Sequence, residues 1–310
     1  MIIVFGSLNM DMHMGVNRFP QVGETILSFD YDMSPGGKGG NQALAAARWG
    51  VRTAMVGKIG DDGYGVRILN SLRRNEVMTS GIAKSDTLPT GLAMVVTDQG
   101  GQNQMIVASG ANSELSAEQV PDEILKPGNY VLFQMEVPLI QNIEVMVRAH
   151  KRGAKTVLNL APAIKIPKEA LPYIDYLILN ELEAGQIAGS MGYNIGRDDV
   201  AFAQTMARDG QLTCIVTLGA RGAVAMLPEG RGWRIDAMPL TRVVDTAGAG
   251  DCFCGTLTAL LHEGFTLPEA MKWASVAGGL CCTKKGTQEA YPYRGDVEEH
   301  IGSLADARQI

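Results

Sequence analysis

The 310-residue chain has few charged residues, few aromatic residues and no long uninterrupted apolar run. Charged side chains make up 19% of the sequence and aromatic side chains 6%, and the formal net charge is −6. A negative balance argues against general binding to nucleic acids or acidic membranes. No segment reaches the roughly 18 consecutive apolar residues of a membrane span, and the N-terminus lacks the basic start of a signal peptide. We therefore expect a cytoplasmic protein with no nucleic-acid partner and no membrane partner.

Cysteine and histidine are also sparse, and neither is spaced as in a metal site. The five cysteines are odd in number and lie among apolar or small residues, which favours a reduced chain. No two of them have the C-x-x-C spacing of a zinc site. Gly37 and Lys38 are followed by Gly39, not by the Ser or Thr of a Walker loop, and no G-x-G-x-x-G follows the first apolar run. A nicotinamide-dependent oxidoreductase is therefore poorly supported.

Short apolar runs alternate with helical patterns along most of the chain. Hydrophobic residues make up 46% of the sequence, enough for a sizeable core. Several runs are apolar throughout, as in strands covered on both faces. The alternation predicts an α/β fold with a mostly parallel central sheet flanked by helices. Strands are expected at 2–7, 53–57, 130–135, 156–160, 176–180 and 213–219, and helices at about 41–50, 62–75, 139–152, 181–189, 197–209, 252–264, 267–282 and 296–307.

Two segments interrupt this pattern with shorter strands in which polar and apolar residues alternate. They cover about 11–35 and about 91–109, and the second has a hairpin turn at Gly100-Gly101. We expect them to form a small antiparallel β-sheet that is inserted into the main domain as a lid. No low-complexity linker or internal repeat divides the chain. A single domain spanning 1–310 is therefore expected.

A carboxylate directly follows a glycine-rich turn in the stretch VVDTAGAGDCFCG. Gly248, Ala249 and Gly250 precede an apolar run with helical spacing, so they lie at a helix N-terminus, where several backbone N–H groups have no partner. Small residues and the helix dipole favour an anion there. A carboxylate such as Asp251 would repel a phosphate at rest, so its presence there suggests a catalytic role. The role that fits is that of a general base for an attacking hydroxyl. Aspartate is also a favoured helix cap, and this stretch alone favours the cap.

Two further polar stretches lie where ligands commonly bind. GSLNMD ends the first strand, and open parallel sheets bind ligands at the carboxyl ends of their strands. Asn9 and Asp11 lie two positions apart, so they project to the same side of an extended chain. SPGGKGGNQALAAA places four glycines before an alanine-rich helix, and Asn41 and Gln42 offer amide groups in its first turn. Taken singly, each stretch is also compatible with an ordinary turn.

Together these three stretches resemble those of the ribokinase-like carbohydrate kinases. The resemblance extends from Ile2 to about Tyr293, and its motifs occur in the family's order. The combination is highly specific, whereas GAGD alone is moderately so. It implies a single α/β domain with a β-sheet lid that is often shared across a dimer, so we expect a homodimer formed through the lid. The additional motifs are GDDGYG, TG before a lid strand, SGAN, QMEVP, LNLAPA, LNELEA, TLGARG and KKGTQ.

The activity that the resemblance implies is ATP-dependent phosphorylation of a sugar hydroxyl. The positions within SLNMD, GGKGGNQ and MEVP favour a pentose, and the expected reaction converts D-ribose to ribose 5-phosphate at the primary hydroxyl. Asp251 would be the catalytic base, with Gly248, Ala249 and Gly250 as the anion hole. The residues that would hold the sugar are Asn9, Asp11, Gly37, Lys38, Asn41 and Glu136.

The resemblance also implies sites for ATP, Mg²⁺ and a monovalent cation, K⁺. Asn180 and Glu183 would handle the phosphates and a hydrated Mg²⁺, which prefers oxygen ligands and keeps several waters. The cation would lie beside the anion hole, where the family commonly offers a serine hydroxyl and this chain has Ala290. The nucleotide site would be lined by Thr217, Gly219, Gly222 and Ser275. The positions matching the cation site are Asp245, Ala247, Cys281, Lys284 and Gly286.

Other functions stay open at this point. A relative that phosphorylates fructose, deoxyribose or a nucleoside would carry the same motifs, although a nucleoside kinase needs a lid pocket for a base. Ala93 and Met105 in the lid would limit the size of the sugar. A non-catalytic sugar-binding regulatory protein would bind sugar without turning over ATP, and the intact Asp251 and glycine cradle argue against it.

Overall fold

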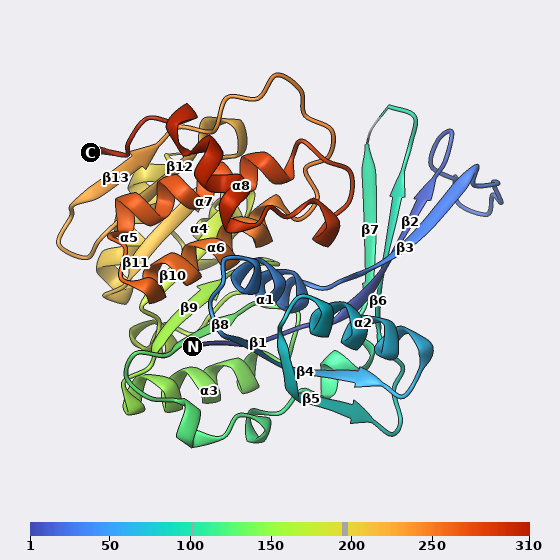
Figure 1. Ribbon diagram of the computed structural model, residues 1–310, viewed down its shortest axis with the longest axis horizontal. Helices are drawn as coiled ribbons and strands as arrows, with labels where there is room; N and C mark the ends of the chain where they lie inside the picture. Colours follow the sequence, from blue (N-terminus) through green and yellow to red (C-terminus); the bar gives the residue numbers. More distant parts are fainter. Residues whose placement is uncertain (101, 194–197) are drawn as a thin grey trace.

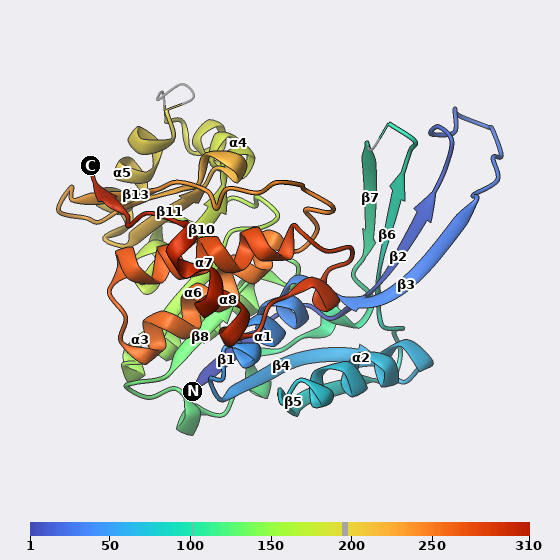
Figure 2. The ribbon, with the colours of Figure 1, turned by 45° about the horizontal axis from the view of Figure 1, so that its top comes forward.

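Helices cover both faces of a ten-stranded sheet, and a separate four-stranded sheet stands away from one side of this body (Figures 1 and 2). The computed structural model describes residues 1–100, 102–193 and 198–310. The predicted α/β fold, with a mostly parallel central sheet flanked by helices and a small additional β-sheet, is confirmed. Among the described helices, none is both long enough and apolar enough to cross a membrane.

The large sheet has the order β14-β13-β12-β11-β10-β9-β8-β1-β4-β5. Its strands from β11 to β5 run parallel, and the three strands beyond β11 extend it in antiparallel pairs. All parallel strands therefore direct their carboxyl ends to one edge of the sheet, where ligands bind in open α/β folds. The bounds are β1 Ile2–Phe5, β4 Thr53–Gly60, β5 Met78–Ser85, β8 Tyr130–Phe133, β9 Lys155–Asn159, β10 Tyr176–Asn180, β11 Thr213–Thr217, β12 Ala223–Met226, β13 Gly232–Ile235 and β14 Arg308–Gln309.

Two hydrophobic cores lie on opposite faces of the large sheet. Ile2 and Val4 of β1 belong to one core and Ile3 and Phe5 to the other, because successive side chains of a strand point to opposite faces. This explains why β1 is apolar at every position. The first core is covered by α1 (Lys38–Arg48), α2 (Gly63–Arg74), α6 (Ala249–Glu263), α7 (Leu267–Cys281) and α8 (Arg294–His300). The second is covered by α3 (Leu139–Arg152), α4 (Glu181–Met191) and α5 (Asp199–Gly210).

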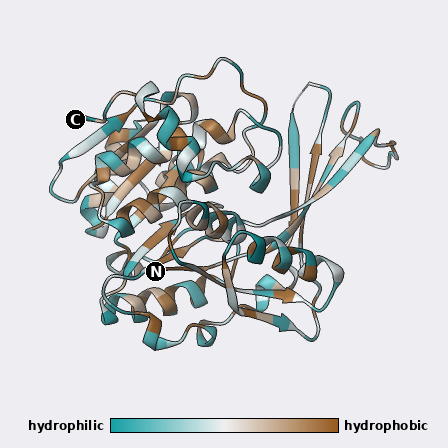
Figure 3. Ribbon diagram, viewed as in Figure 1, coloured by the Kyte–Doolittle hydropathy of each residue, from teal (hydrophilic) through white to brown (hydrophobic). Residues whose placement is uncertain are grey.

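The small sheet consists of β2 (Asn9–Gly15), β3 (Asp30–Gly36), β6 (Gly91–Thr97) and β7 (Asn103–Ala108), in the order β3-β2-β6-β7. The expectation of an antiparallel sheet is confirmed for its outer pairs and wrong for the central pair β2–β6, which is parallel because the chain crosses back through the body between these two strands. Only three residues separate β1 from β2, so one short segment joins the two sheets. Figure 3 shows that hydrophilic residues occupy the far end of the small sheet, whereas the large sheet is mostly hydrophobic.

Some predicted elements differ from those observed. The helix expected at 296–307 is present but shorter: α8 ends at His300 and a 3-10 turn follows at Ile301–Ser303, while Arg308 and Gln309 pair with β13 as a strand. The sequence analysis did not predict β5, β12 or β13. The expected turn at Gly100-Gly101 and the start of the helix expected at 197–209 fall partly on residue 101 and residue 197, which lie outside the described residues.

Candidate active site

The glycine-rich turn forms the N-terminus of α6, as predicted. Gly248 is its N-cap and has φ 74°, the left-handed region that favours glycine. A Cβ atom at Gly248 would lie 2.4 Å from Thr287 Cγ2 and 2.7 Å from Tyr291 Oη, so no larger residue fits. A Cβ atom at Gly250 would meet nothing within 4 Å, because that position opens onto a cavity. At Gly250 this turn therefore opens onto free space at the positive end of a helix, while the Ala249 N–H donates to the Thr246 carbonyl at 3.3 Å.

Asp251 lies in the first turn of α6 and is buried. Its Oδ2 accepts a hydrogen bond from Asn41 Nδ2 at 3.0 Å, and its Oδ1 accepts one from Gln42 Nε2 at 2.8 Å. Both donors come from α1, which packs against α6. The carboxylate therefore has a defined orientation, as a base that must meet a reacting hydroxyl requires.

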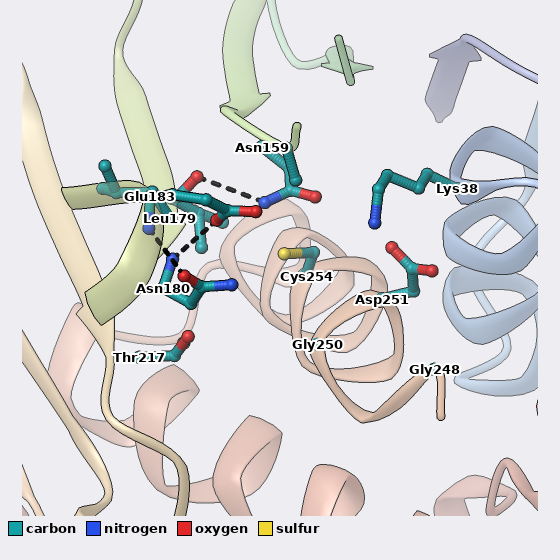
Figure 4. Close-up of a pocket in the computed structure, with 12 residues that line it drawn as sticks. Lys38, Asn159, Leu179, Asn180, Glu183, Thr217, Gly248, Gly250, Asp251 and Cys254 are labelled. Atoms are coloured by element: carbon teal, nitrogen blue, oxygen red, sulfur yellow. Dashed lines mark hydrogen bonds between the residues drawn. The ribbon is translucent and has the colours of Figure 1, made fainter. Parts of the chain in front are cut away.

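A cavity of about 210 Å³ lies between Asp251 and the carboxyl ends of β9, β10 and β11. Figure 4 shows the Lys38 ammonium directed toward the Asp251 carboxylate, with Asn180 and Glu183 on the opposite wall. Cys254 also lines this cavity, and burial raises the pKa of its thiol well above the usual range, so it stays protonated. Asp251 is consequently better suited than Cys254 to accept a proton there.

Lys38 connects this cavity to a second one of about 580 Å³. Burial alone would lower the pKa of Lys38, but the carboxylates of Asp251, Glu136 and Glu183 outweigh it and keep the pKa raised. The ammonium therefore stays charged. Glu136 lines the second cavity together with Met105 and Val107 of β7. This second cavity lies between the body and the small sheet.

Residues predicted to bind sugar gather around the joint between the two sheets. Asp11 on β2 is half-buried, and burial together with the negative charges of Glu136 and Asp251 raises its pKa to about 7. Glu136 accepts a hydrogen bond from Ser7 Oγ at 2.6 Å, and Gly37 is the N-cap of α1. Asn9 is buried, and its Oδ1 accepts a hydrogen bond from Asn112 Nδ2 at 2.7 Å. Acidic and amide groups of this kind suit a polyhydroxylated ligand.

Asn180 and Glu183 form a capping box at the start of α4. The Glu183 N–H donates to Asn180 Oδ1 at 2.9 Å, and the Asn180 N–H donates to Glu183 Oε2 at 2.8 Å. Burial raises the pKa of Glu183, while the nearby Lys38 opposes that shift. The capping box engages only Oε2, so Oε1 is left for the cavity. A single carboxylate oxygen beside a phosphate site fits a hydrated Mg²⁺, which takes few protein ligands.

All four residues predicted for the nucleotide line one cavity of about 570 Å³, on the other side of the α6 N-terminus. Thr217 and Gly250 line both this cavity and the one that holds Asp251. Phe253, Met238 and Val243 give it apolar walls, as a nucleobase requires. The predicted residues are Thr217, Gly219, Gly222 and Ser275.

The turn before α6 contacts the segment that follows α7, as the predicted cation positions require. Asp245 accepts hydrogen bonds from the Ala247 N–H at 3.0 Å and the Gly286 N–H at 3.1 Å. The Cys281 thiol faces the Ala247 carbonyl at 3.7 Å, and the Cys281 carbonyl accepts a bond from the Lys284 N–H. Carboxylate and carbonyl oxygens thus gather here and fit a monovalent cation, although Ala290 is buried and offers no hydroxyl.

Several polar residues of the site were missed or given no role by the sequence analysis. Gln42 was noted only as an amide in the first turn of its helix, and its contact with Asp251 was not foreseen. Asn159 and Gln134 end apolar strands and are buried beside Gln42. A polar residue at the carboxyl end of an otherwise apolar strand is the signal that could have identified them. The loop around Met238 carried no such signal, because apolar residues in a loop suggest only packing.

Comparison with known proteins assigns the chain to a protein family. The model of the pfkB family carbohydrate kinases matches residues 1–294. The chain belongs to this family. It is 34% identical to the ribokinase of Haemophilus influenzae over 303 residues, covering 97% of this chain and 98% of the relative. It is also 34% identical to the ribokinase of Bacillus subtilis, covering 96% and 98% of the two chains.

Solved structures agree with this family assignment. The ribokinase of Thermotoga maritima superposes with a TM-score of 0.89 at 30% identity, covering 97% of this chain and 99% of the other. The Arabidopsis thaliana ribokinase, solved with ribose and ATP, gives a TM-score of 0.87 at 29% identity, covering 97% and 98%. The fold of this pfkB-family kinase, small sheet included, is therefore that of solved ribokinases.

Proposed function

We propose that this carbohydrate kinase transfers the γ-phosphoryl group of ATP to the primary hydroxyl of D-ribose, giving ribose 5-phosphate. The observation that carries the proposal is the position of Asp251. Its carboxylate lies at the N-terminus of α6. The Asp251 cavity shares Thr217 and Gly250 with the nucleotide cavity, and it shares Lys38 with the cavity beside the small sheet. The full-length similarity to ribokinases supports ribose as the sugar.

The mechanism follows from the placement of the chain's own groups. The sugar binds at the joint between the sheets, against Asn9, Asp11 and Asn41, with its primary hydroxyl toward Asp251. Asp251 takes the proton of that hydroxyl as it attacks the γ-phosphorus, and the bond from this phosphorus to the bridging oxygen of ADP breaks. The N–H groups of Ala249 and Gly250 and the charge of Lys38 stabilise the transferring phosphoryl group. Positioning and charge neutralisation supply most of the catalysis.

The nucleotide and its metal occupy the other side of the α6 N-terminus. The apolar walls around Met238 hold the base, and Thr217 and Gly250 meet the phosphates. Asn180 and Glu183 would hold a hydrated Mg²⁺, which would neutralise phosphate charge. Asp245 and the carbonyl oxygens of Ala247 and Cys281 would hold K⁺ beside the anion hole. Lys284 and Gly286 complete that turn.

The remaining parts of the proposal concern the whole molecule. The chain forms one domain over 1–310, in which the small sheet acts as a lid that closes over the sugar. Met105 and Ile106 of β7 are 62% and 71% exposed, and apolar side chains at a sheet edge favour burial against a second copy. We therefore include a homodimer formed through the lid. The proposal also includes a cytoplasmic location, which the few, oddly numbered cysteines favour.

The test is ATP consumption by the purified protein with ribose, 2-deoxyribose, fructose, adenosine and inosine, each with and without K⁺. We expect the highest kcat/KM with ribose and a rise in rate with K⁺. The Asp251→Asn variant is the matched control, because it must bind sugar without turning over ATP. Preference for a nucleoside or for fructose would leave the catalytic assignments in place and refute ribose. Sugar binding without any ATP turnover would instead indicate a non-catalytic sugar-binding protein.

A further inference from the structure

Two rows of buried amide side chains converge on the Asp251 carboxylate. In the first row Gln134 Nε2 donates to Gln42 Oε1 at 2.7 Å, and Gln42 Nε2 donates to Asp251 Oδ1 at 2.8 Å. In the second, Gln288 Nε2 donates to Asn41 Oδ1 at 3.0 Å, and Asn41 Nδ2 donates to Asp251 Oδ2 at 3.0 Å. Each carboxylate oxygen thus receives one amide hydrogen bond from a residue that is itself held by another amide.

The Gln42 amide has a single orientation that satisfies all its contacts. Its second N–H donates to Asn159 Oδ1 at 3.0 Å, and Asn159 Nδ2 donates to the backbone carbonyl of Ile178 at 3.2 Å. A backbone carbonyl can only accept, so it fixes which end of the Asn159 amide faces Gln42. If the Gln42 amide were flipped, its oxygen would face both Asn159 Oδ1 and the Asp251 carboxylate. The backbone of β10 therefore dictates that Gln42 presents an N–H to Asp251.

Gln42 cannot act on the substrates directly. Its side chain is 0% exposed, and so is that of Gln134 behind it. Asn41 differs, because we propose that it also contacts the sugar and so must divide its hydrogen bonds between sugar and carboxylate. Gln42 has no such second task. Its bond to Asp251 can persist while sugar enters and product leaves.

We infer that Gln42 is a positioning residue for Asp251, and that Gln134 and Asn159 orient Gln42. This inference rests on the proposed function, in which Asp251 is the general base. The fixed amide keeps the carboxylate in one rotamer and stabilises its charged form before the sugar arrives. The arrangement corresponds to the third group that orients a catalytic base in other enzymes.

A double-mutant cycle tests this inference. Gln42→Met keeps the length of the side chain and removes its donor. We expect kcat to fall about 10- to 100-fold, the factor for one hydrogen bond to a charged group, with KM for ribose within about threefold of wild type. In an Asp251→Asn background the same change should cost less than about threefold, because Gln42 acts through Asp251. An equal loss in both backgrounds, or no loss in either, refutes the inference.

A further variant separates positioning from simple packing, because it perturbs the buried body without removing a hydrogen bond to Asp251. Thr258→Val is the matched control: Thr258 is buried on α6 and its hydroxyl bonds only the Cys254 carbonyl. It should leave kcat unchanged at a similar cost in melting temperature.

A spectroscopic readout distinguishes failure of this inference from failure of the proposed function. With [4-¹³C]aspartate, the Asp251 carboxyl signal is assigned by its loss in Asp251→Asn. At a fixed pH of about 8, loss of the amide donor should move this signal in Gln42→Met and not in Thr258→Val. A signal that does not move refutes the inference even in a protein that phosphorylates ribose. If Gln42→Met does not fold, Gln134→Met removes one bond and should show the same changes, with a kcat loss of about threefold.

Discussion

The two sheets of this kinase differ in how far their strands are buried. Every residue of β1 is buried, whereas every residue of β7 is exposed. The large sheet carries the Asp251 cavity at the carboxyl ends of its strands, and the small sheet contributes Met105 and Val107 to the neighbouring cavity. In the proposed function, chemistry that needs fixed geometry therefore lies on the buried body, and recognition that needs access lies on the exposed sheet.

The joint between the sheets is where these two tasks meet. β1 leads through Ser7 to β2 within three residues, and Ser7 also bonds Glu136 from the body. A movement of the small sheet about this joint would change the surroundings of Asp11 and leave the amide contacts of Asp251 in place. The comparison thus predicts different kinetic effects for substitutions in the two regions.

The largest effect is expected from Asp251→Asn in the body. We expect kcat to fall by about 10²- to 10⁴-fold, the contribution typical of a general base, while ribose still binds with near-normal affinity. Steady-state kinetics and calorimetric titration with ribose would measure the two quantities. A near-normal kcat would show that the base lies elsewhere and would break the division of tasks between the sheets.

A substitution in the small sheet should act on binding instead. Asp11→Ala removes the proposed sugar contact, so we expect KM for ribose to rise about 10- to 100-fold, with a smaller change in kcat. The matched measurement is KM for ATP, which should stay within about twofold of wild type because the nucleotide cavity lies across α6. A fall in kcat with KM for ribose unchanged would contradict the comparison.

The exposed edge of the small sheet offers a test of assembly. Ile106→Lys places a charge on β7 and should weaken the proposed dimer by about tenfold or more, as measured by sedimentation at several protein concentrations. Ile140→Lys is the matched control, since Ile140 is 67% exposed on α3 of the body. Equal sedimentation of both variants and wild type would place any dimer interface elsewhere.

The smallest effect concerns pH and the joint between the sheets. Because burial and the charges of Glu136 and Asp251 raise the pKa of Asp11 to about 7, the folded chain keeps a proton that the unfolded chain loses near pH 4. Stability contributed by this proton is present below pH 4 and is lost as the pH rises toward 7. The melting temperature of Asp11→Asn minus that of wild type should therefore rise by about 2–4 °C between pH 4.5 and 7.5. A constant difference would contradict the raised pKa.

The sequence predicted the central strands of the large sheet better than those toward its two edges. IIVF is apolar at every position and YLILN at every position but its last, a pattern that favours a strand covered on both faces. β5 contains Gly81, Lys84 and several small residues, and β14 has two residues, so neither has a periodic signal of its own. These strands form because their neighbours offer a sheet edge.

The site was predictable where its residues lie in glycine-rich turns. Gly248 and Gly250 mark the proposed anion hole in the sequence because only glycine fits one position and only a small residue leaves the other open. The contact between Gln42 and Asp251 was not predictable, because 209 residues separate the two along the chain. Their proximity depends on α1 packing against α6, which is a property of the fold.

The burial of α6 has a consequence for how this enzyme loses activity on heating. All residues from Asp251 to Leu261 are buried, and the helix packs between α1 and α7. Backbone amides in such a helix exchange with solvent only when the whole body opens, whereas those of β7 exchange by local opening. The catalytic turn is thus anchored to the slowest-exchanging part of the molecule. Thermal inactivation should coincide with global unfolding, long after the small sheet has begun to open.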